Sequence, residues 1–403
     1  MDIKKLAEKY DAYVIQQRRF FHRCPELSFE EEETTRELKE RLEEMGIPVI
    51  TFPDYHGLVG IIEGGKPGGT VMLRADIDAL PVEEKTGLPF ASTNGKMHAC
   101  GHDAHMAMLL GAARILMDCR EDIKGTVKLL FQSAEESCHG AEYYVEKGVL
   151  DDSEAIFGMH IWGTLDAPLI NIEGGGRMAS CDNFTITVNG ISSHGSAPHL
   201  GKDAIVAAAS IVMNLQTFAS RMNDPLNTLV VSIGTIHGGQ RFNIIANEVK
   251  MEGTIRTYSR ELRKTMESQL RNIICSTAQA LGCTAELDYH AYLGPVINDH
   301  EDLNRIARNA AVKLYGEESM TTMPRLTGSE DFSMLADKIP GVYGFIGCIN
   351  KEAGAIYSNH NDKFTVDETV LHRGAGLYAQ FAVDFLEEKS SQELREHKVR
   401  SNS

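Results

Sequence analysis

The sequence predicts an α/β fold with a mostly parallel sheet, interrupted by a smaller α+β domain. Helical and strand-like segments alternate through residues 1–179 and again through residues 293–403, which is the pattern of a parallel sheet covered by helices. Residues 180–292 instead suggest a small sheet backed by two helices. We therefore expect one larger domain, formed by residues 1–179 and 293–403, and one inserted domain, formed by residues 180–292.

The first part of the larger domain is expected to begin with two amphipathic helices. Apolar residues recur at helical spacing over residues 3–21 and 29–45, and Gly46 and Pro48 end the second helix. Strands are expected at residues 58–65, 70–81, 126–136 and 154–163, with a helix at 104–117. The last three strands end in ionisable residues. Because ligands of such sheets usually lie beyond the carboxyl ends of the strands, we expect a functional site there.

The inserted domain begins with a strand after residue 180. A polar loop follows, and Asp203 is placed to cap the next helix. The remaining expected elements are strands at 228–239, 248–259 and 284–294 and a helix at 261–281. The larger domain then resumes with a helix at 301–315, a strand at 342–347 and a final helix at 367–388.

Composition and charge exclude several classes of partner. The 403 residues are 42% hydrophobic and 24% charged, as in ordinary globular proteins. A net charge of −17 would repel nucleic acid and anionic membrane surfaces, so we expect neither as a partner. The first residues do not resemble a signal peptide and no apolar run approaches the ~20 residues of a membrane-spanning helix, so we expect a cytoplasmic protein. The eight cysteines are too scattered for a disulfide scaffold.

Side chains that bind metal ions gather at the predicted strand ends and helix starts. They comprise one thiol, two carboxylates and three imidazoles: Cys100, Glu135, Glu136, His102, His160 and His360. Cys100 and His102 lie together in "MHACGHDAHM", directly before a predicted helix. Such groups converging from separate elements, with one carboxylate left to move a proton, are typical of a dinuclear metal site. Each residue alone would be weak evidence, but the set predicts a metal centre.

Two other interpretations remain open from the residues alone. In a cysteine hydrolase, Cys100 would be the nucleophile and His102 its base, but the glutamate pair and the other two histidines would then have no role. In a non-catalytic protein that binds metal or a small molecule, the ions would bind without turnover. The presence of Glu135 beside a candidate ligand speaks against that second interpretation.

Nine segments, in order, are similar to those of the metal-dependent N-acyl-amino-acid amidohydrolases. This family includes hippurate hydrolase, the indole-acetyl-amino-acid hydrolases and bacterial deacylases, and belongs to the aminoacylase and carboxypeptidase clan of metallopeptidases. The segments are "HRCPELSFEE", "RADIDALP", "MHACGHDAHM", "QSAEE", "GMH", "SSHGSAPH", "GTIRT", "GSEDF" and "NHNDKF". The resemblance covers nearly the whole chain, and its most specific part is the Cys-x-Gly-His turn followed by Glu-Glu and Met-His.

The resemblance implies a catalytic domain split by a lid or dimerisation domain, two divalent metal ions per subunit and a homodimer or higher oligomer. The implied metal ligands are Cys100, His102, Glu136, His160 and His360. Glu135 occupies the position of the general base, and Asp78 that of a carboxylate that orients a ligand. The wider family has its first histidine ligand where this sequence has Asp76, so the role of Asp76 stays open.

The expected chemistry is hydrolysis of the amide bond of an N-acyl-L-amino acid. Two ions would polarise the acyl oxygen and lower the pKa of a water molecule, and Glu135 would carry a proton from that water to the leaving amine. A thiolate ligand favours zinc, whereas carboxylate-rich sites accept manganese, so the identity of the ions stays open.

Three residues of the inserted domain are expected at the substrate. The resemblance implies that His194 reaches the active site of a neighbouring subunit and stabilises the tetrahedral oxyanion. Asn243 and Arg256 are candidates for binding the substrate carboxylate, because a guanidinium fork matches that shape. The acyl group stays open between acetyl, benzoyl and aryl-acetyl, and N-acetyl-diaminopimelate and aminobenzoyl-glutamate are alternative substrates.

Overall fold

The computed structural model describes residues 1–401, with side chains described up to residue 391. The chain forms two compact units. The larger unit comprises Met1–Gly175, Ile297–Pro324 and Asp331–Ser403, and the smaller unit comprises Gly176–Val296 and Arg325–Glu330. Within the described residues, no helix has both the length and the apolar character needed to cross a membrane.

The larger unit is built on a seven-stranded sheet with the order β1-β2-β4-β3-β5-β13-β6. Its four central strands run parallel: β4 (Lys124–Gln132), β3 (Lys66–Asp76), β5 (Ala155–Asp166) and β13 (Gly341–Ile349). Antiparallel strands complete the two edges: β1 (Val49–Phe52), β2 (Tyr55–Glu63) and β6 (Ile170–Asn171). The mostly parallel sheet predicted from the sequence is confirmed.

The order of the central strands places a topological switch point between β3 and β5. The chain leaves β3 toward β4 on one side and leaves β5 toward β6 on the other, so the connections from these two neighbouring strands run in opposite directions. Ligands of open α/β sheets bind at such a switch point, beyond the carboxyl ends of the strands. The pairing of β5 with β3 ends at Gly158 opposite Arg74, so His160 lies beyond the part of β5 that pairs with β3, although it still pairs with Phe345 of β13.

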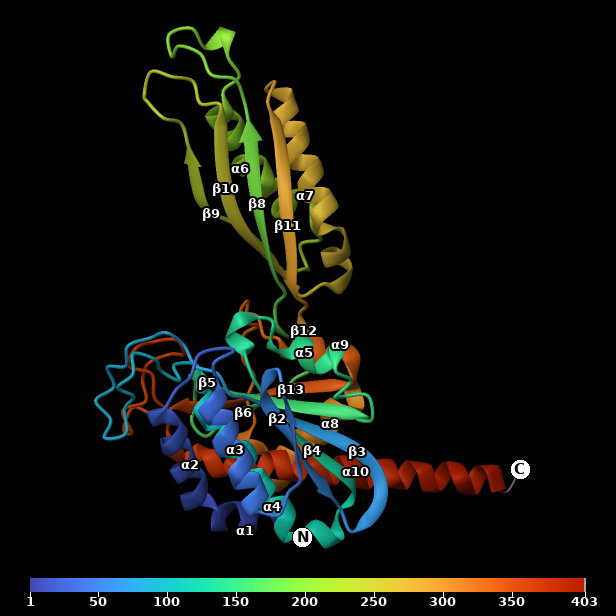
Figure 1. The fold of residues 1–403 in the computed structure, drawn as a ribbon. Coiled ribbons are helices and arrows are strands. Elements are labelled where there is room, and N and C mark those ends of the chain that lie inside the picture. Colours follow the sequence, from blue (N-terminus) through green and yellow to red (C-terminus); the bar gives the residue numbers. More distant parts are fainter. Residues whose placement is uncertain (402–403) are drawn as a thin grey trace. The chain divides into compact units, whose positions relative to one another are not determined.

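Helices cover the sheet of the larger unit (Figure 1). They are α1 (Ile3–Lys9), α2 (Asp11–Arg23), α3 (Glu32–Glu44), α4 (His102–Asp118), α5 (Gly140–Glu146), α8 (Glu301–Tyr315), α9 (Phe332–Lys338) and α10 (Leu371–Ser401). Nearly every residue of α4 is buried. Its Gly111 lets neighbouring helices approach closely, because a Cβ there would lie 2.6 Å from Val14 and 2.8 Å from Ala375. This packing anchors the helix whose first turn carries His102.

The N-terminal segment differs from the prediction. Residues 3–21 were expected to form one helix, but α1 and α2 are separate because Tyr10 leaves helical geometry at φ −96° and ψ 8°. The break allows both Lys9 (2.6 Å) and the Tyr10 hydroxyl (2.8 Å) to bond to Asp118 at the end of α4. The final helix also differs, since α10 continues to Ser401, past the expected end at residue 388.

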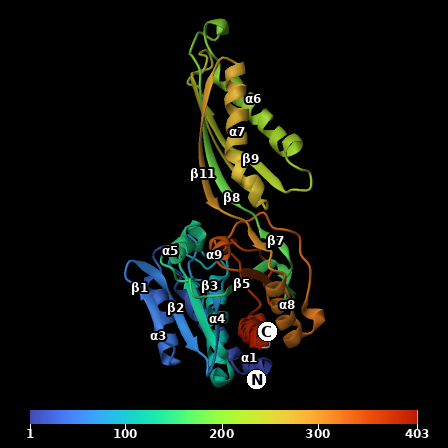
Figure 2. The ribbon, with the colours of Figure 1, turned by 90° about the vertical axis from the view of Figure 1, so that its right-hand side faces the viewer.

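The smaller unit has a four-stranded antiparallel sheet with the order β11-β8-β10-β9. The strands are β8 (Cys181–Asn189), β9 (Leu229–Gly238), β10 (Glu248–Thr257) and β11 (Thr284–Leu293). Two helices, α6 (Ala204–Thr217) and α7 (Arg260–Ala280), cover one face of this sheet and bury a separate core (Figure 2). As expected, Asp203 caps α6 by accepting hydrogen bonds from two main-chain N–H groups. Strands β7 (Gly175–Met178) and β12 (Val296–Asn298) pair where the chain passes between the units.

Candidate metal centre

The turn before α4 brings Cys100 next to two histidines. Gly101 adopts φ +104°, and a Cβ at that position would come within 2.5 Å of Ile161, so the turn requires glycine. Cys100 Sγ lies 3.3 Å from His160 Nε2 and 3.3 Å from His360 Nε2. Three of the predicted ligands therefore converge, although one of them comes from far downstream in the chain.

Hydrogen bonds hold the loop of His360 against this turn. The His360 N–H donates to the Ala99 carbonyl at 2.7 Å, and the Asn359 side chain donates to the Cys100 carbonyl at 2.7 Å. His360 is itself in the left-handed region, at φ +67°, which is unusual for a residue with a side chain. Its side chain is 56% exposed, so the cluster faces solvent on this side.

The imidazoles of His102 and His160 are oriented by main-chain carbonyls. Nδ1 of His102 donates to the Asp78 carbonyl at 2.8 Å, and Nδ1 of His160 donates to the Ile161 carbonyl at 2.6 Å. Because a carbonyl only accepts hydrogen bonds, Nδ1 carries the proton in both rings. Nε2 of each ring is then the nitrogen that would face a metal ion, which is how metal-binding histidines are commonly held.

The two glutamates share one short turn, Glu135–Ser137, after β4. Left-handed residues with side chains bracket it, Ala134 at φ +63° and Cys138 at φ +62°. Side chains from three other elements accept the main-chain N–H groups of this segment: Tyr144 Oη for Ser133 (3.1 Å), Glu31 for Ala134 (2.8 Å) and Asp78 for Glu136 (2.9 Å). The conformation of the turn is therefore held by hydrogen bonds to side chains that are distant in the sequence or belong to other elements.

Two buried atoms in the cluster have no hydrogen-bond partner among the described residues. They are His102 Nε2 and Glu136 Oε1, which lie 3.9 Å apart. Such buried, unpaired polar atoms need an explanation, and a cation between them provides one. Cys100 belongs to two groups of three candidate ligands. One group adds His102 and His160, and the other adds Glu136 and His360. Within each group the ligand atoms lie within 4.8 Å of one another. These residues would fit two divalent ions, with Cys100 common to both groups.

The pKa values of the buried groups in the cluster also favour bound cations. Burial, together with Glu136 and Glu135, raises the pKa of Cys100 well above its usual value. Burial likewise raises the pKa of Glu136 to about 7, against the opposing effect of His102. Burial and the neighbouring His105 hold the pKa of His160 well below its usual value, so this ring is neutral. Bound cations would reverse the penalty on the thiolate and the carboxylate.

Asp76 belongs to a hydrogen-bond network beneath the cluster. It accepts from His105 Nδ1 at 2.5 Å and from Arg74 at 2.8 Å. Nε2 of His105 in turn accepts the Ile161 N–H at 2.8 Å. The nearest oxygen of Asp76 lies 3.8 Å from His102 Nε2. Asp76 therefore supports the end of β3 and the backbone beside His160.

Asp78 contacts two of the candidate ligands. Besides its bond to the Glu136 N–H, its carboxylate lies 3.2 Å from His102 Nδ1 and accepts the Ser28 hydroxyl at 2.7 Å. The position of Asp78 suits the orienting role expected for it, which stays a prediction.

The other three predicted site residues belong to the smaller unit. His194 and Asn243 lie on adjacent loops, since the Gly195 N–H donates to the Asn243 carbonyl at 2.8 Å. The His194 side chain accepts from the Ser196 hydroxyl at 2.7 Å. Arg256 is on β10 and donates to the Thr327 carbonyl at 3.3 Å. Their roles at the substrate stay predictions.

Sequence reasoning missed two buried carboxylates that support the site. Glu31 holds the glutamate turn, and Asp331 accepts hydrogen bonds from Arg74 (3.0 Å), the Gln132 side chain (2.7 Å) and the Ala141 N–H (2.9 Å). Both residues occur in segments that carried the family resemblance, "HRCPELSFEE" and "GSEDF". An acidic residue inside such a motif, without an assigned role, was the signal available.

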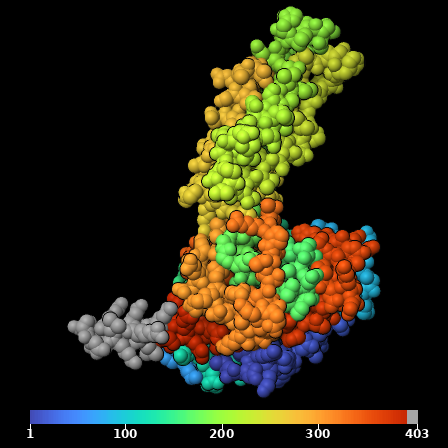
Figure 3. Space-filling view, turned by 180° about the vertical axis from the view of Figure 1, so that it is seen from behind, coloured from blue at the N-terminus to red at the C-terminus, as the bar shows by residue number. Residues whose placement is uncertain are grey.

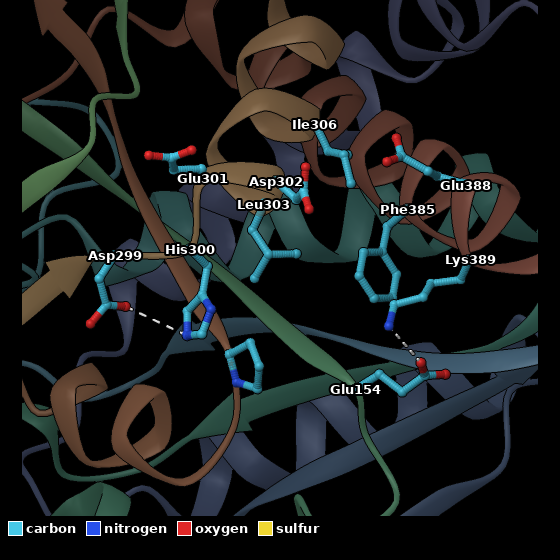
Figure 4. Close-up of a pocket in the computed structure, with 11 residues that line it drawn as sticks. Glu154, Asp299, His300, Glu301, Asp302, Leu303, Ile306, Phe385, Glu388 and Lys389 are labelled. Carbon is cyan, nitrogen blue, oxygen red and sulfur yellow. Dashed lines mark ion pairs between the residues drawn. The ribbon is translucent and has the colours of Figure 1, made fainter. Parts of the chain in front are cut away.

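A separate pocket of about 390 Å³ lies at the amino ends of the parallel strands, opposite the ends that carry the cluster (Figure 4). Its lining includes Glu154 and Pro340, which directly precede β5 and β13 and so mark the amino ends of these parallel strands. Two ion pairs lie in this pocket: His300 with Asp299 at 3.5 Å and Lys389 with Glu154 at 3.2 Å. This pocket is distinct from the cluster at the carboxyl ends.

A mostly parallel α/β sheet with candidate thiol, imidazole and carboxylate ligands gathered at its switch point is the arrangement expected of a metal-dependent hydrolase. Comparison with known families agrees, because the model of peptidase family M20/M25/M40 matches residues 72–384. The chain belongs to this family and is a metal-dependent amidohydrolase.

Relatives of the chain cover nearly its whole length. Thermostable carboxypeptidase 1 of Saccharolobus solfataricus is 38% identical over 390 residues, covering 95% of this chain and 98% of its own. N-acetylcysteine deacetylase of Bacillus subtilis is 38% identical over 385 residues, covering 95% and 99%. The crystal structure of Bacillus subtilis YXEP, described as a dinuclear metal-binding peptidase, is 36% identical, with a TM-score of 0.84 and coverage of 94% and 99%.

Proposed function

We propose that the enzyme hydrolyses the amide bond of N-acyl-L-amino acids and releases a carboxylic acid and a free amino acid. The two relatives support this substrate class, because a deacetylase of an N-acetyl amino acid and a carboxypeptidase both cleave an amide next to a free α-carboxylate. The acyl group is of the acetyl, benzoyl or aryl-acetyl type.

The observation that carries the proposal is the position of Glu135. It is buried, 7% exposed, and its carboxylate groups with His102 and Glu136 within 4.8 Å. Two bound divalent ions would polarise the acyl oxygen and lower the pKa of the attacking water. Glu135 then accepts the proton of this water and delivers it to the leaving nitrogen, while Glu136 stays committed to the ligand set.

The remaining roles follow the chemistry of the substrate. Asp78 orients His102, and Arg256 and Asn243 bind the α-carboxylate of the amino acid. His194 stabilises the oxyanion in the active site of a partner subunit. The thiolate of Cys100 favours zinc, and the two carboxylates make manganese the alternative ion.

We also propose a homodimer formed through the smaller unit. β9 is an edge strand, and its second half is exposed, including Ile236 at 52%. Unpaired edge strands associate readily with another strand. The outer surface of α6 (Figure 3) adds three exposed apolar side chains: Ile205, Val206 and Met213. A second copy of the chain, pairing β9 with β9, would cover these groups.

The test of the proposed function is a panel of substrates with the purified protein loaded with zinc or with manganese. Release of free amine is measured for N-acetyl, benzoyl and indole-acetyl amino acids, for N-acetyl-diaminopimelate and aminobenzoyl-glutamate, and for N-blocked dipeptides. Turnover of simple N-acyl amino acids is expected. Turnover of the dipeptides alone would make the enzyme a carboxypeptidase, and turnover that survives complete removal of metal would point to Cys100 as a nucleophile.

A further inference from the structure

We propose that Glu31 is a positioning residue that holds Ala134 in its left-handed conformation and so aims the Glu135–Glu136 pair. The expected effect of Glu31 on turnover rests on the proposed role of Glu135 as the general base. The expected effect of Glu31 on the conformation of the turn is independent of that role.

Glu31 reaches the turn from a distant part of the sequence. It directly precedes α3, its side chain is completely buried, and it lies 103 residues from Ala134. One carboxyl oxygen accepts the Ala134 N–H at 2.8 Å, and the other accepts the Ser133 hydroxyl at 2.7 Å. Ser133 and Ala134 are also completely buried, so water cannot replace these contacts.

The backbone at Ala134 needs such a contact. At φ +63° and ψ 35° its Cβ crowds the following peptide, a conformation that residues with side chains rarely adopt without support. The neighbouring N–H groups are held by Tyr144 and Asp78, but the Ala134 N–H has only Glu31 as its acceptor among the contacts described. Without Glu31, the turn would relax toward right-handed geometry and turn both glutamates away from the cluster.

The protonation of Glu31 suits this role. Burial, together with the charge of Asp78, raises the pKa of Glu31 to about 8. A protonated carboxyl group still accepts the Ala134 N–H with one oxygen and donates from the other to the Ser133 hydroxyl. A glutamine side chain presents the same pattern of one acceptor and one donor, whereas leucine presents neither at nearly the same volume.

The first experiment compares Glu31→Leu, Glu31→Gln and the control Glu30→Leu. Glu30 is next in the chain, but its side chain is exposed and pairs with Lys96 at 2.7 Å. Glu31→Leu is expected to lower kcat about 10- to 100-fold at saturating metal, with KM changed less than about threefold, since small misplacements of catalytic groups cost this much. Glu31→Gln is expected to stay within about threefold of the wild type and Glu30→Leu to match it.

The second experiment adds Ala134→Gly to Glu31→Leu. Glycine adopts positive φ without the Cβ penalty, so the double variant is expected to recover about three- to tenfold of the lost kcat. A general loss of stability would not be repaired by this one substitution. If Glu31→Leu does not fold, the measurement is whether Ala134→Gly restores folding. Restored folding would support the role of Glu31 in holding residue 134 at positive φ, and no restoration would contradict it. An unchanged kcat in a folded Glu31→Leu variant, or no recovery with Ala134→Gly, would overturn the proposal.

A third measurement is independent of activity. Amide hydrogen exchange of the segment 133–138 in the metal-free protein is expected to be faster in Glu31→Leu than in the wild type, and unchanged in Glu30→Leu. Equal protection in Glu31→Leu and wild type would refute the positioning role. A wild type that fails to hydrolyse any N-acyl amino acid would instead refute the proposed function, while the exchange result would still decide the role of Glu31.

Discussion

His105 donates from Nδ1 to Asp76 at 2.5 Å, so a buried imidazole joins the last residue of β3 to the neighbouring strand. The other nitrogen of this ring accepts the N–H of Ile161, next to the predicted ligand His160. The pair fixes the separation of two strands at the point where their mutual pairing has ended.

Replacing His105 should therefore weaken both folding and metal binding. His105→Ala leaves an Asp76 oxygen and the Ile161 N–H buried without partners, at about 1–3 kcal/mol each in the free energy of unfolding. Supporting contacts of this kind typically change metal affinity by about 10- to 100-fold. Denaturant unfolding and metal titration measure the two effects. His290→Ala, at an exposed position, is the control, and equal metal affinity in both variants would show that His105 does not position His160.

Cys100→Ser should lower metal content as well as turnover. A serine hydroxyl stays protonated at neutral pH and binds zinc poorly, whereas the thiolate is a soft ligand. Metal analysis after exhaustive dialysis measures the bound ions, with Cys24→Ser, at an exposed cysteine, as the control. Full metal occupancy and an unchanged rate in Cys100→Ser would remove this residue from the ligand set.

Glu135→Gln and Glu136→Gln should fail in different ways. Loss of the general base in Glu135→Gln is expected to lower kcat by about 10²- to 10⁴-fold with both ions retained. Glu136→Gln is expected to lose metal instead, because it removes an anionic ligand. Metal content and kcat measured on the same samples separate the two results. The reverse pattern would exchange the two roles.

Subunits that carry different defects should complement each other if His194 acts across a dimer. A hybrid of His194→Ala and Glu135→Gln subunits contains one site with both residues intact, so mixing the two inactive proteins should restore up to about a quarter of the wild-type activity under random exchange. Subunit exchange is followed independently by mass spectrometry of the intact dimers. Exchange without any return of activity would show that His194 does not act in trans.

Substrates without a free carboxylate should be poor if Arg256 and Asn243 bind that group. The wild type is expected to prefer an N-acyl amino acid over its C-terminal amide, and Arg256→Ala should reduce this preference in kcat/KM by about 10- to 150-fold, the value of a charge-assisted hydrogen bond. Lys250→Ala, which removes a positive charge from the same strand, is the control. Equal turnover of acid and amide by the wild type would eliminate the carboxylate contact and N-acyl amino acids as the substrate class.

The candidate ligands were predictable because their signals are local. A thiol and imidazoles at a helix start, and paired acids at a strand end, can be recognised in a few consecutive residues, and the alternation of strands and helices indicated which edge of the sheet they share. Asp76 was ambiguous for the opposite reason. Its two partners, Arg74 and His105, become visible only once β3 and α4 pack together.

Long-range contacts explain the other gaps. The role of Glu31 depends on a bond to a residue 103 positions away, which no local pattern reports. The segment Arg325–Glu330 clusters with the smaller unit through main-chain contacts such as the bond from Ala179 to Gly328 at 2.7 Å, although its sequence neighbours belong to the larger unit. The separation of α1 from α2 likewise reflects contacts with Asp118 and not a helix-breaking residue.

The strand order of the larger unit has a consequence for how the enzyme is made. β13 lies between β5 and β6 in the sheet, yet the ribosome synthesises it about 170 residues after them, beyond the whole of the smaller unit. The nascent chain must therefore hold an open sheet edge until β13 emerges, and such edges are prone to aggregation. His360 appears only eleven residues after the end of β13. The predicted ligand set is therefore incomplete until after β13, the strand that completes the sheet, has been synthesised.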